Sequence, residues 1–159
     1  MRTIDRLLSE YGESHKNPTN KAVHWVCVPI IFWSVTALLW AVKIPYMIPG
    51  LDIELNAAII ALTLVLVYYV TLSPVLAFGM LLFSVGCLGL SHVIEQALIP
   101  YHFPIWAVAL IAFVLAWIGQ FWGHKVEGKK PSFLKDLQFL LVGPAWLMSF
   151  IFTKIGIRY

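Results

Sequence analysis

Four long apolar runs dominate this chain and decide what it can fold into. They cover residues 22–42, 55–72, 75–94 and 105–123, and a further apolar segment follows at residues 139–152. At about 1.5 Å per residue, a helix over the first run is about 30 Å long, which is the thickness of a bilayer's hydrocarbon core. We therefore predict an all-α membrane protein with a bundle of about four transmembrane helices. We expect one integral-membrane domain over residues 1–159.

The composition excludes several other classes of protein. Only 12% of the residues are charged and 60% are hydrophobic, with a mean hydropathy of +0.84. A soluble domain carries roughly 25% charged residues, and a disordered chain is poor in apolar ones. A net charge of +3 provides no basic stripe for nucleic acid, so we expect membrane lipid and not nucleic acid as a partner. Cys27 and Cys87 lie inside apolar runs and are interpreted as small buried hydrophobic residues.

Prolines and glycines divide the apolar runs. Ser73 and Pro74 separate the second run from the third, which predicts a tight turn between antiparallel neighbours. Gly143 and Pro144 interrupt the last segment, which therefore forms either a re-entrant or interfacial hairpin or a fifth helix. The first 21 residues are rich in charge and contain no apolar run, so we expect no secretory signal there.

The basic residues predict the orientation in the membrane. They gather in two segments, one before the first run and one after the fourth: Arg2, Arg6, Lys16 and Lys21, then Lys125, Lys129, Lys130 and Lys135. Because cytoplasmic loops carry an excess of lysine and arginine, both segments are predicted to be cytoplasmic. An even number of membrane crossings between them is consistent with this.

Three of the five histidines lie in or beside these two basic segments. His15 and His24 flank the start of the first run, and His124 ends the fourth, so the predicted topology brings all three to one depth. Asn17 is a suitable N-cap, with Pro18 at the first helical position. His15 or His24 taken alone is better explained as a polar residue at a wet helix start, so only the convergence of the histidines indicates a site.

Two histidines are each followed three residues later by a glutamate, which places both side chains on one helix face. In the pair of His124 and Glu127, the carboxylate can bind a metal, orient the imidazole, or pair with neighbouring lysines, and Gln120 one turn earlier is a candidate for similar work. His92 and Glu95 form the second pair. An ionisable residue in a membrane segment is a functional candidate, but the 18 residues from 75 to 92 cover about 27 Å and place His92 near the opposite face.

The donor set narrows the choice of metal. Neutral imidazoles with few carboxylates suit Fe(II), Zn or Cu and not Mg or Ca. Histidine-rich sites with open coordination positions are typical of non-haem iron that activates oxygen. His102 stands beside two prolines and is interpreted as an interfacial loop residue.

Two motifs resemble a known family. The first has His15, Asn17, Pro18, Asn20 and His24 in the spacing H-x-N-P-x-N-x-x-x-H, followed by Val28-Pro29. The second runs from Gln120 to Pro131 in the spacing Q-F-x-G-H-x-x-E-x-x-x-P, and Gly143-Pro144 adds a third point of likeness. Together they resemble the Mpo-type 2-hydroxy fatty acid dioxygenases, which are small multi-span membrane proteins.

The resemblance implies an activity and a set of site residues. The activity is Fe(II)-dependent oxidative cleavage of a 2-hydroxy fatty acid between C1 and C2 by molecular oxygen, giving a fatty acid one carbon shorter. His15, His24 and His124 are the implied iron ligands, with His92 as a fourth candidate. Asn17, Asn20 and Glu127 are the implied residues around the ligands. A 2-hydroxy acid can chelate iron through its carboxylate and hydroxyl, and its acyl chain would lie among the apolar helices.

Two other functions remain open from the residues. His24 and His124, at corresponding ends of two predicted helices, are suitable axial ligands for a haem. Alternatively, the chain is a non-enzymatic lipid-binding or transport accessory protein whose histidines are interfacial.

Overall fold

The computed structural model describes residues 2–51, 53–128 and 139–159 of the chain. Six α-helices account for most of it: α1 (Thr3–Gly12), α2 (Pro18–Trp40), α3 (Ala57–Leu72), α4 (Pro74–Leu98), α5 (Ile105–Glu127) and α6 (Phe139–Lys154). A 3-10 turn, η1 (Ile99–Tyr101), follows α4. The predicted all-α fold is confirmed. The basic residues Lys129, Lys130 and Lys135 and the motif residue Pro131 lie outside the described ranges.

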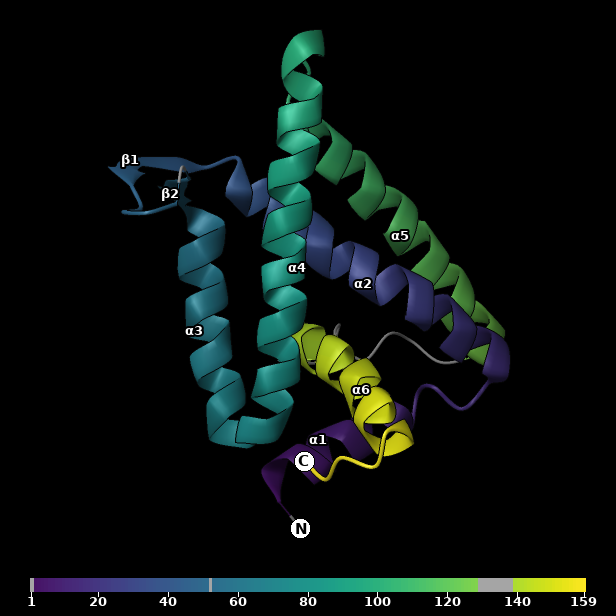
Figure 1. Ribbon diagram of the computed structural model, residues 1–159. Helices are drawn as coiled ribbons and strands as arrows, with labels where there is room; N and C mark the ends of the chain where they lie inside the picture. Colours follow the sequence, from purple (N-terminus) through teal and green to yellow (C-terminus); the bar gives the residue numbers. More distant parts are fainter. Residues whose placement is uncertain (1, 52, 129–138) are drawn as a thin grey trace.

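The helices are arranged as three pairs: α2 with α5, α3 with α4, and α1 with α6 (Figure 1). α2 and α5 run side by side, and α3 and α4 form an antiparallel hairpin next to them. α1 and α6 pack together at the end of the molecule where both chain termini lie. At the other end, the short strands β1 (Lys43–Met47) and β2 (Glu54–Asn56) form an antiparallel hairpin with the pairing Lys43 to Asn56 and Met47 to Glu54. This hairpin occupies a connector for which no strand was predicted.

Local sequence explains where the helices begin. The side chain of Asn17 accepts a hydrogen bond from the Thr19 backbone N–H (2.8 Å), so Asn17 caps α2 as predicted, with Pro18 at its first position. Ser73 alone separates α3 from α4, and its hydroxyl accepts from the Leu76 N–H (3.2 Å). The tight turn expected at Ser73 and Pro74 is therefore confirmed.

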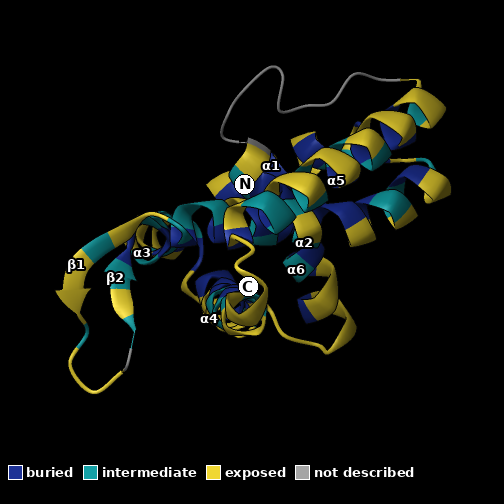
Figure 2. Cartoon of the chain, turned by 90° about the horizontal axis from the view of Figure 1, so that it is seen from above, coloured by how far each residue is buried: buried dark blue, intermediate teal, exposed yellow. Residues whose placement is uncertain are grey.

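Within the described ranges, three helices are long and apolar enough to cross a membrane: Pro18–Trp40, Pro74–Tyr101 and Ile105–Glu127. The predicted second span corresponds to α3, which is apolar but has 16 residues, fewer than the roughly 20 that a span needs. Many large hydrophobic side chains on the outer faces of α4 and α5 are exposed, among them Phe78, Leu82, Leu115 and Ile118. Figure 2 shows exposed residues along α5. Exposed apolar area on this scale indicates a membrane protein.

The C-terminal segment forms a helix, which is one of its two predicted forms. α6 is one continuous helix of 16 residues that contains Pro144, so Gly143 and Pro144 do not produce a hairpin. Pro144 lies inside the helix and supplies no backbone N–H, so the helix continues with one hydrogen bond fewer. α6 packs against α1, α2 and α4, and the Tyr69 hydroxyl of α3 donates to the Leu141 carbonyl (2.6 Å). The two cysteines are free and buried, as expected.

Candidate metal centre

Three histidines from separate parts of the fold meet at one point. His15 lies in the turn between α1 and α2, His24 lies on the second turn of α2, and His124 lies in the last turn of α5. One nitrogen from each ring lies within 4.8 Å of those from the other two. The side chains are only 1%, 1% and 5% exposed. The predicted convergence of these three residues is therefore observed, and together they could hold a metal ion.

Hydrogen bonds fix the orientation of two of the imidazoles. His15 Nδ1 lies 2.6 Å from the Tyr11 carbonyl oxygen, and His24 Nδ1 lies 2.9 Å from that of Asn20. A carbonyl only accepts, so both Nδ1 atoms carry a proton and both Nε2 atoms of the neutral rings carry lone pairs. These two Nε2 atoms lie 2.8 Å apart. Two lone pairs at this distance repel each other unless a cation lies between or beside them, so the pair has the geometry of metal ligands.

Burial favours the neutral form of the His15 ring. Loss of contact with water lowers the pKa of His15, because the charged imidazolium is poorly solvated there. The ring stacks on Tyr11 with 4.3 Å between the ring centroids and an angle of 13° between the planes. Trp146 of α6 lies against it at 5.2 Å. A neutral imidazole is the form that binds a metal, so this environment favours coordination.

Glu127 holds the turn that carries His15. One of its carboxylate oxygens accepts from the Lys16 backbone N–H (3.0 Å) and the other from that of Asn17 (2.7 Å). The Asn20 amide donates to Glu127 (3.3 Å) and to the Ser14 carbonyl (3.2 Å). Glu127 thus ties the end of α5 to the start of α2, where the helix dipole also favours a negative charge. It accepts these bonds instead of orienting His124, whose Nδ1 has no hydrogen-bond partner among the described residues.

Two glycines bring His124 close to His24. A Cβ on Gly123 would lie 2.6 Å from the Asn20 Oδ1, and one on Gly119 would lie 2.7 Å from the Cys27 Sγ. Both distances are too short for real atoms, so α2 and α5 approach closely only because these two positions lack side chains. Glycines four residues apart favour this kind of contact between membrane helices. The spacing G-x-x-x-G at residues 119 and 123 is a signal for this contact in the sequence.

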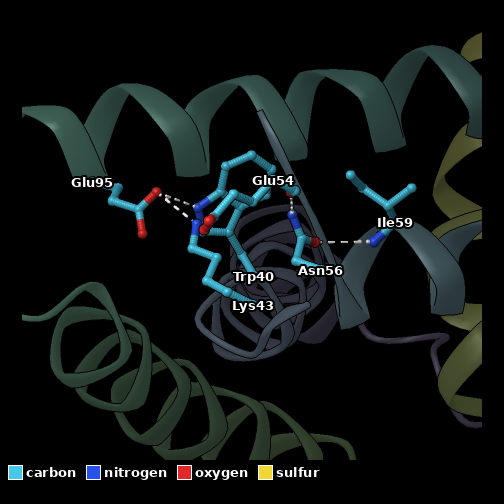
Figure 3. Close-up of polar contacts among 6 residues, drawn as sticks. All are labelled: Trp40, Lys43, Glu54, Asn56, Ile59 and Glu95. Carbon is cyan, nitrogen blue, oxygen red and sulfur yellow. Dashed lines mark hydrogen bonds and ion pairs between the residues drawn. The ribbon is translucent and has the colours of Figure 1, made fainter. Parts of the chain in front are cut away.

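His92 is not part of this cluster. It lies on α4 beside Trp40, with 6.1 Å between the ring centroids. Trp40 ends α2, and at the helical rise it is about 24 Å from His24. Glu95 accepts from Trp40 Nε1 (2.7 Å) and pairs with Lys43 Nζ (2.8 Å), as Figure 3 shows next to the Asn56 cap of α3. His102 is exposed and ends η1 in a left-handed conformation, so it is a loop residue as expected.

An apolar cavity of about 310 Å³ opens from the three histidines. It follows one face of α2 from His24 to Leu39 and one face of α5 from His124 back to Phe113. Ala61 and Leu62 of α3 line it near the hairpin end, and Leu141 of α6 lines it near the histidines. Along α2 this lining covers about 22 Å at the helical rise.

Tyr11 and Trp146 surround His15 but were not among the predicted site residues. Tyr11 comes from α1, whose buried residues Ile4, Leu7, Leu8 and Tyr11 follow the spacing of an amphipathic helix. That signal is present in the sequence. The sequence around Trp146 carries no comparable signal, because the position of Trp146 depends on how α6 packs against α1.

The fold and the site together define a class: an all-α membrane protein with a buried three-histidine centre that opens into an apolar cavity. The comparisons with known proteins give the family. A family model described as "2-hydroxy-palmitic acid dioxygenase Mpo1-like" matches residues 1–155. The chain belongs to this family, as the resemblance of its motifs implied.

One curated relative has a similar sequence. The 2-hydroxy-palmitic acid dioxygenase MPO1 of Saccharomyces cerevisiae is 29% identical over 151 residues, which make up 94% of this chain and 79% of that protein. No solved structure matches this chain.

Proposed function

We propose that this protein is an Fe(II)-dependent dioxygenase that cleaves 2-hydroxy fatty acids between C1 and C2. The observation that carries the proposal is the pair of Nε2 lone pairs on His15 and His24, 2.8 Å apart, at the mouth of an apolar cavity. Family membership supports the reaction type, since both the family model and the yeast relative are named for 2-hydroxy-palmitic acid dioxygenase.

The residues present fit an iron ion. His15, His24 and His124 would hold it through neutral imidazoles, a donor set that suits iron, zinc or copper and not magnesium or calcium. Bound there, Fe(II) would supply the redox activity that O2 requires and a Lewis-acid position for the substrate's head. The Tyr11 and Asn20 carbonyls would keep two of the rings oriented. Asn17, Asn20 and Glu127 would position the turn that carries His15.

The cavity would take the acyl chain. Its walls are almost entirely aliphatic and aromatic side chains, and its lining covers about 22 Å along α2. One leaflet's share of a hydrocarbon core is about 15 Å, so the cavity is long enough for the chain of a membrane lipid. The carboxylate and hydroxyl of the substrate would then lie at the histidines.

The overall reaction balances with one molecule of oxygen. The C1–C2 bond and the C2–H bond of the substrate break, and their four electrons reduce O2. C2 becomes the carboxyl carbon of a fatty acid one carbon shorter, C1 leaves as CO2, and the remaining oxygen leaves as water. The buried site would exclude bulk water from this chemistry, because its three histidines are 5% exposed or less.

We propose a multi-pass arrangement with the chain's N-terminus and the histidine cluster on the cytoplasmic side. Lys16, Lys21 and Lys125 lie close to the cluster in sequence, and the β1–β2 hairpin lies at the opposite end of α2. The excess of positive charge at the cluster end supports this orientation. The polar head of the substrate would meet the site at that interface.

The geometry favours direct coordination over a haem. His15 packs against both other imidazoles, with ring centroids 4.2 Å from His24 and 5.0 Å from His124. A porphyrin between His24 and His124 would have to displace it. An absorption spectrum of the purified protein tests this point, because a haem would give a Soret band.

The direct experiment measures oxygen consumption by the purified, iron-loaded protein. We expect uptake with 2-hydroxyhexadecanoic acid, together with a product that mass spectrometry identifies as pentadecanoic acid, and no uptake with hexadecanoic acid. The H124A variant should lose the activity, while H102A, which changes an exposed loop histidine, should keep it. Binding of fatty acids without any oxygen uptake would instead favour the non-enzymatic lipid-binding function.

The length of the cavity gives a second test. Ala61 lines its far end, so A61W should shorten the space for the acyl chain. We expect A61W to lose activity on a 16-carbon substrate at least tenfold while retaining it on a 10-carbon one. Equal losses on both substrates would show that the chain does not extend to Ala61.

A further inference from the structure

Gln120 is a buried polar residue whose side-chain amide makes no hydrogen bond within the described part of the fold. It lies on α5 one turn before His124, on the same helix face, and it is 5% exposed. Among the described residues, no hydrogen bond joins its side-chain amide to the protein. Its amide atoms are not among the fully enclosed polar atoms that lack a partner, so they reach the open space of the cavity, where a ligand can meet them.

The position of Gln120 indicates a ligand. It lines the cavity next to the histidines, where the other side chains along α2 and α5 are mostly apolar. Thr36, a polar residue farther along the cavity, already donates its hydroxyl to the Phe32 carbonyl (2.9 Å). Gln120 therefore lines the cavity beside His124, and its side-chain amide remains available for hydrogen bonds to a ligand.

The chemistry of a primary amide matches the head of a 2-hydroxy acid. The NH2 group of glutamine donates and its carbonyl oxygen accepts. A 2-hydroxy acid offers a carboxylate oxygen that accepts and, on the adjacent carbon, a hydroxyl that donates. A plain fatty acid offers the carboxylate alone, and a fatty alcohol offers no carboxylate.

We infer that Gln120 binds the carboxylate and the 2-hydroxyl of the substrate and is the residue that distinguishes 2-hydroxy from unsubstituted fatty acids. This inference rests on the proposed function, since it assigns a residue to the substrate of that reaction. Specificity follows because a plain fatty acid would leave the glutamine carbonyl buried without a partner. Gln120 would act by binding and orienting the head, without taking part in proton or electron transfer.

The test is a binding measurement on the full chain in detergent micelles without added metal, so that no turnover occurs. A fluorescent fatty acid is displaced by hexadecanoic acid, by 2-hydroxyhexadecanoic acid or by hexadecanol, and the three dissociation constants are compared. We expect the wild-type protein to prefer the 2-hydroxy acid over the plain acid by about tenfold, as one hydrogen bond allows.

In Q120M, which has a side chain of similar size without hydrogen-bonding groups, this preference should fall to about one, with hexadecanol binding unchanged. The matched control is Q96M, because Gln96 is exposed on α4 and away from the cavity. Q96M should keep the wild-type preference. Q120E is a second variant of the same shape, and its carboxylate should weaken the binding of both acids relative to hexadecanol through charge repulsion.

The outcomes separate this inference from the proposed function. A wild-type preference that persists in Q120M, or acid binding that is unchanged in Q120E, would overturn the role of Gln120. Equal affinity of the wild-type protein for both acids would overturn it as well, while leaving the acyl cavity in place. If the wild-type protein binds none of the three compounds, the proposed function fails together with the inference.

Discussion

The chain contains the same His-x-x-Glu spacing twice, and the two copies have different surroundings. At His124 and Glu127, the imidazole meets two further histidines and the carboxylate accepts hydrogen bonds from the backbone before α2. At His92 and Glu95, the imidazole lies half-buried beside one tryptophan, and the carboxylate pairs with Lys43 and Trp40. One copy contributes to a candidate metal centre, and the other fastens α4 to the end of α2.

The difference teaches that a spacing on one helix does not make a site. Each copy places its two side chains on one helix face in the same way. The neighbouring elements distinguish them. The turn between α1 and α2 brings His15 to the first copy, and α2 brings His24. At the second copy, α2 brings Trp40 and β1 brings Lys43. The following predictions test this contrast, beginning with the largest expected effect.

The largest difference between the two regions is expected when a histidine of each is replaced by alanine and the activities are compared. H24A removes a proposed metal ligand, so we expect dioxygenase activity to fall by at least a hundredfold. H92A removes a half-buried ring beside Trp40, so activity should remain within about twofold of wild type. The rate of oxygen uptake by iron-supplemented protein is the measurement, with circular dichroism as the check of folding. Comparable losses in both variants would contradict the contrast.

Removing the charge of Glu127 should have the next largest effect. E127Q weakens the bonds to the Lys16 and Asn17 N–H groups and so loosens the turn that carries His15. Because groups around a metal's ligands typically contribute 10- to 100-fold in metal affinity, we expect the affinity for iron to fall by about that factor. The matched variant E95Q changes the second copy of the motif and should leave the affinity unchanged. Metal titration of both variants decides between these results.

A methyl group at Gly123 should disturb the first region through packing alone. G123A places a Cβ 2.6 Å from the Asn20 Oδ1, and over-packing of this kind costs about 1–3 kcal/mol of stability. G89A, on an exposed face of α4 with nothing within 4 Å, should instead stabilise by about 0.5–1 kcal/mol. Unfolding in a denaturant series measures both variants. A G123A variant as stable as wild type would show that α2 and α5 do not need this close contact.

The smallest effect is expected at the ion pair of the second region. Lys43 and Glu95 are partly exposed, with side chains 32% and 25% accessible, so their pair is worth about 1 kcal/mol or less. K43M should therefore lower the free energy of unfolding only slightly, and high salt should reduce the difference. Iron content and activity should not change. A loss of iron in K43M would mean that the two ends of α2 are coupled.

Much of the fold was predictable because its signals are local. The apolar runs predicted α2, α4 and α5, and Asn17 and Ser73 marked the starts of α2 and α4. The α3 run was correctly identified as an apolar helix, but its length of 16 residues is below that of a span. The β1–β2 hairpin and the continuity of α6 through Pro144 depend on contacts with other elements, which the local pattern does not contain.

The candidate site was predictable for a different reason. His15, His24 and His124 lie in segments that the charge pattern placed at one depth, so their meeting followed from topology. The role of Glu127 did not follow, because its partners are backbone N–H groups more than a hundred residues away. Gln120 was a candidate from its spacing to His124, but the role in substrate binding proposed for it depends on the cavity, which the sequence does not show.

The central claim is that His15, His24 and His124 form one metal site and that His92 is not part of it. Its most direct test is the iron content per chain of the wild-type protein and of four alanine variants, measured by mass spectrometry after anaerobic loading with Fe(II). We predict about one iron per chain in the wild type and in H92A, and little or none in H15A, H24A and H124A. Full iron content in all three cluster variants, or its loss in H92A, would contradict this account.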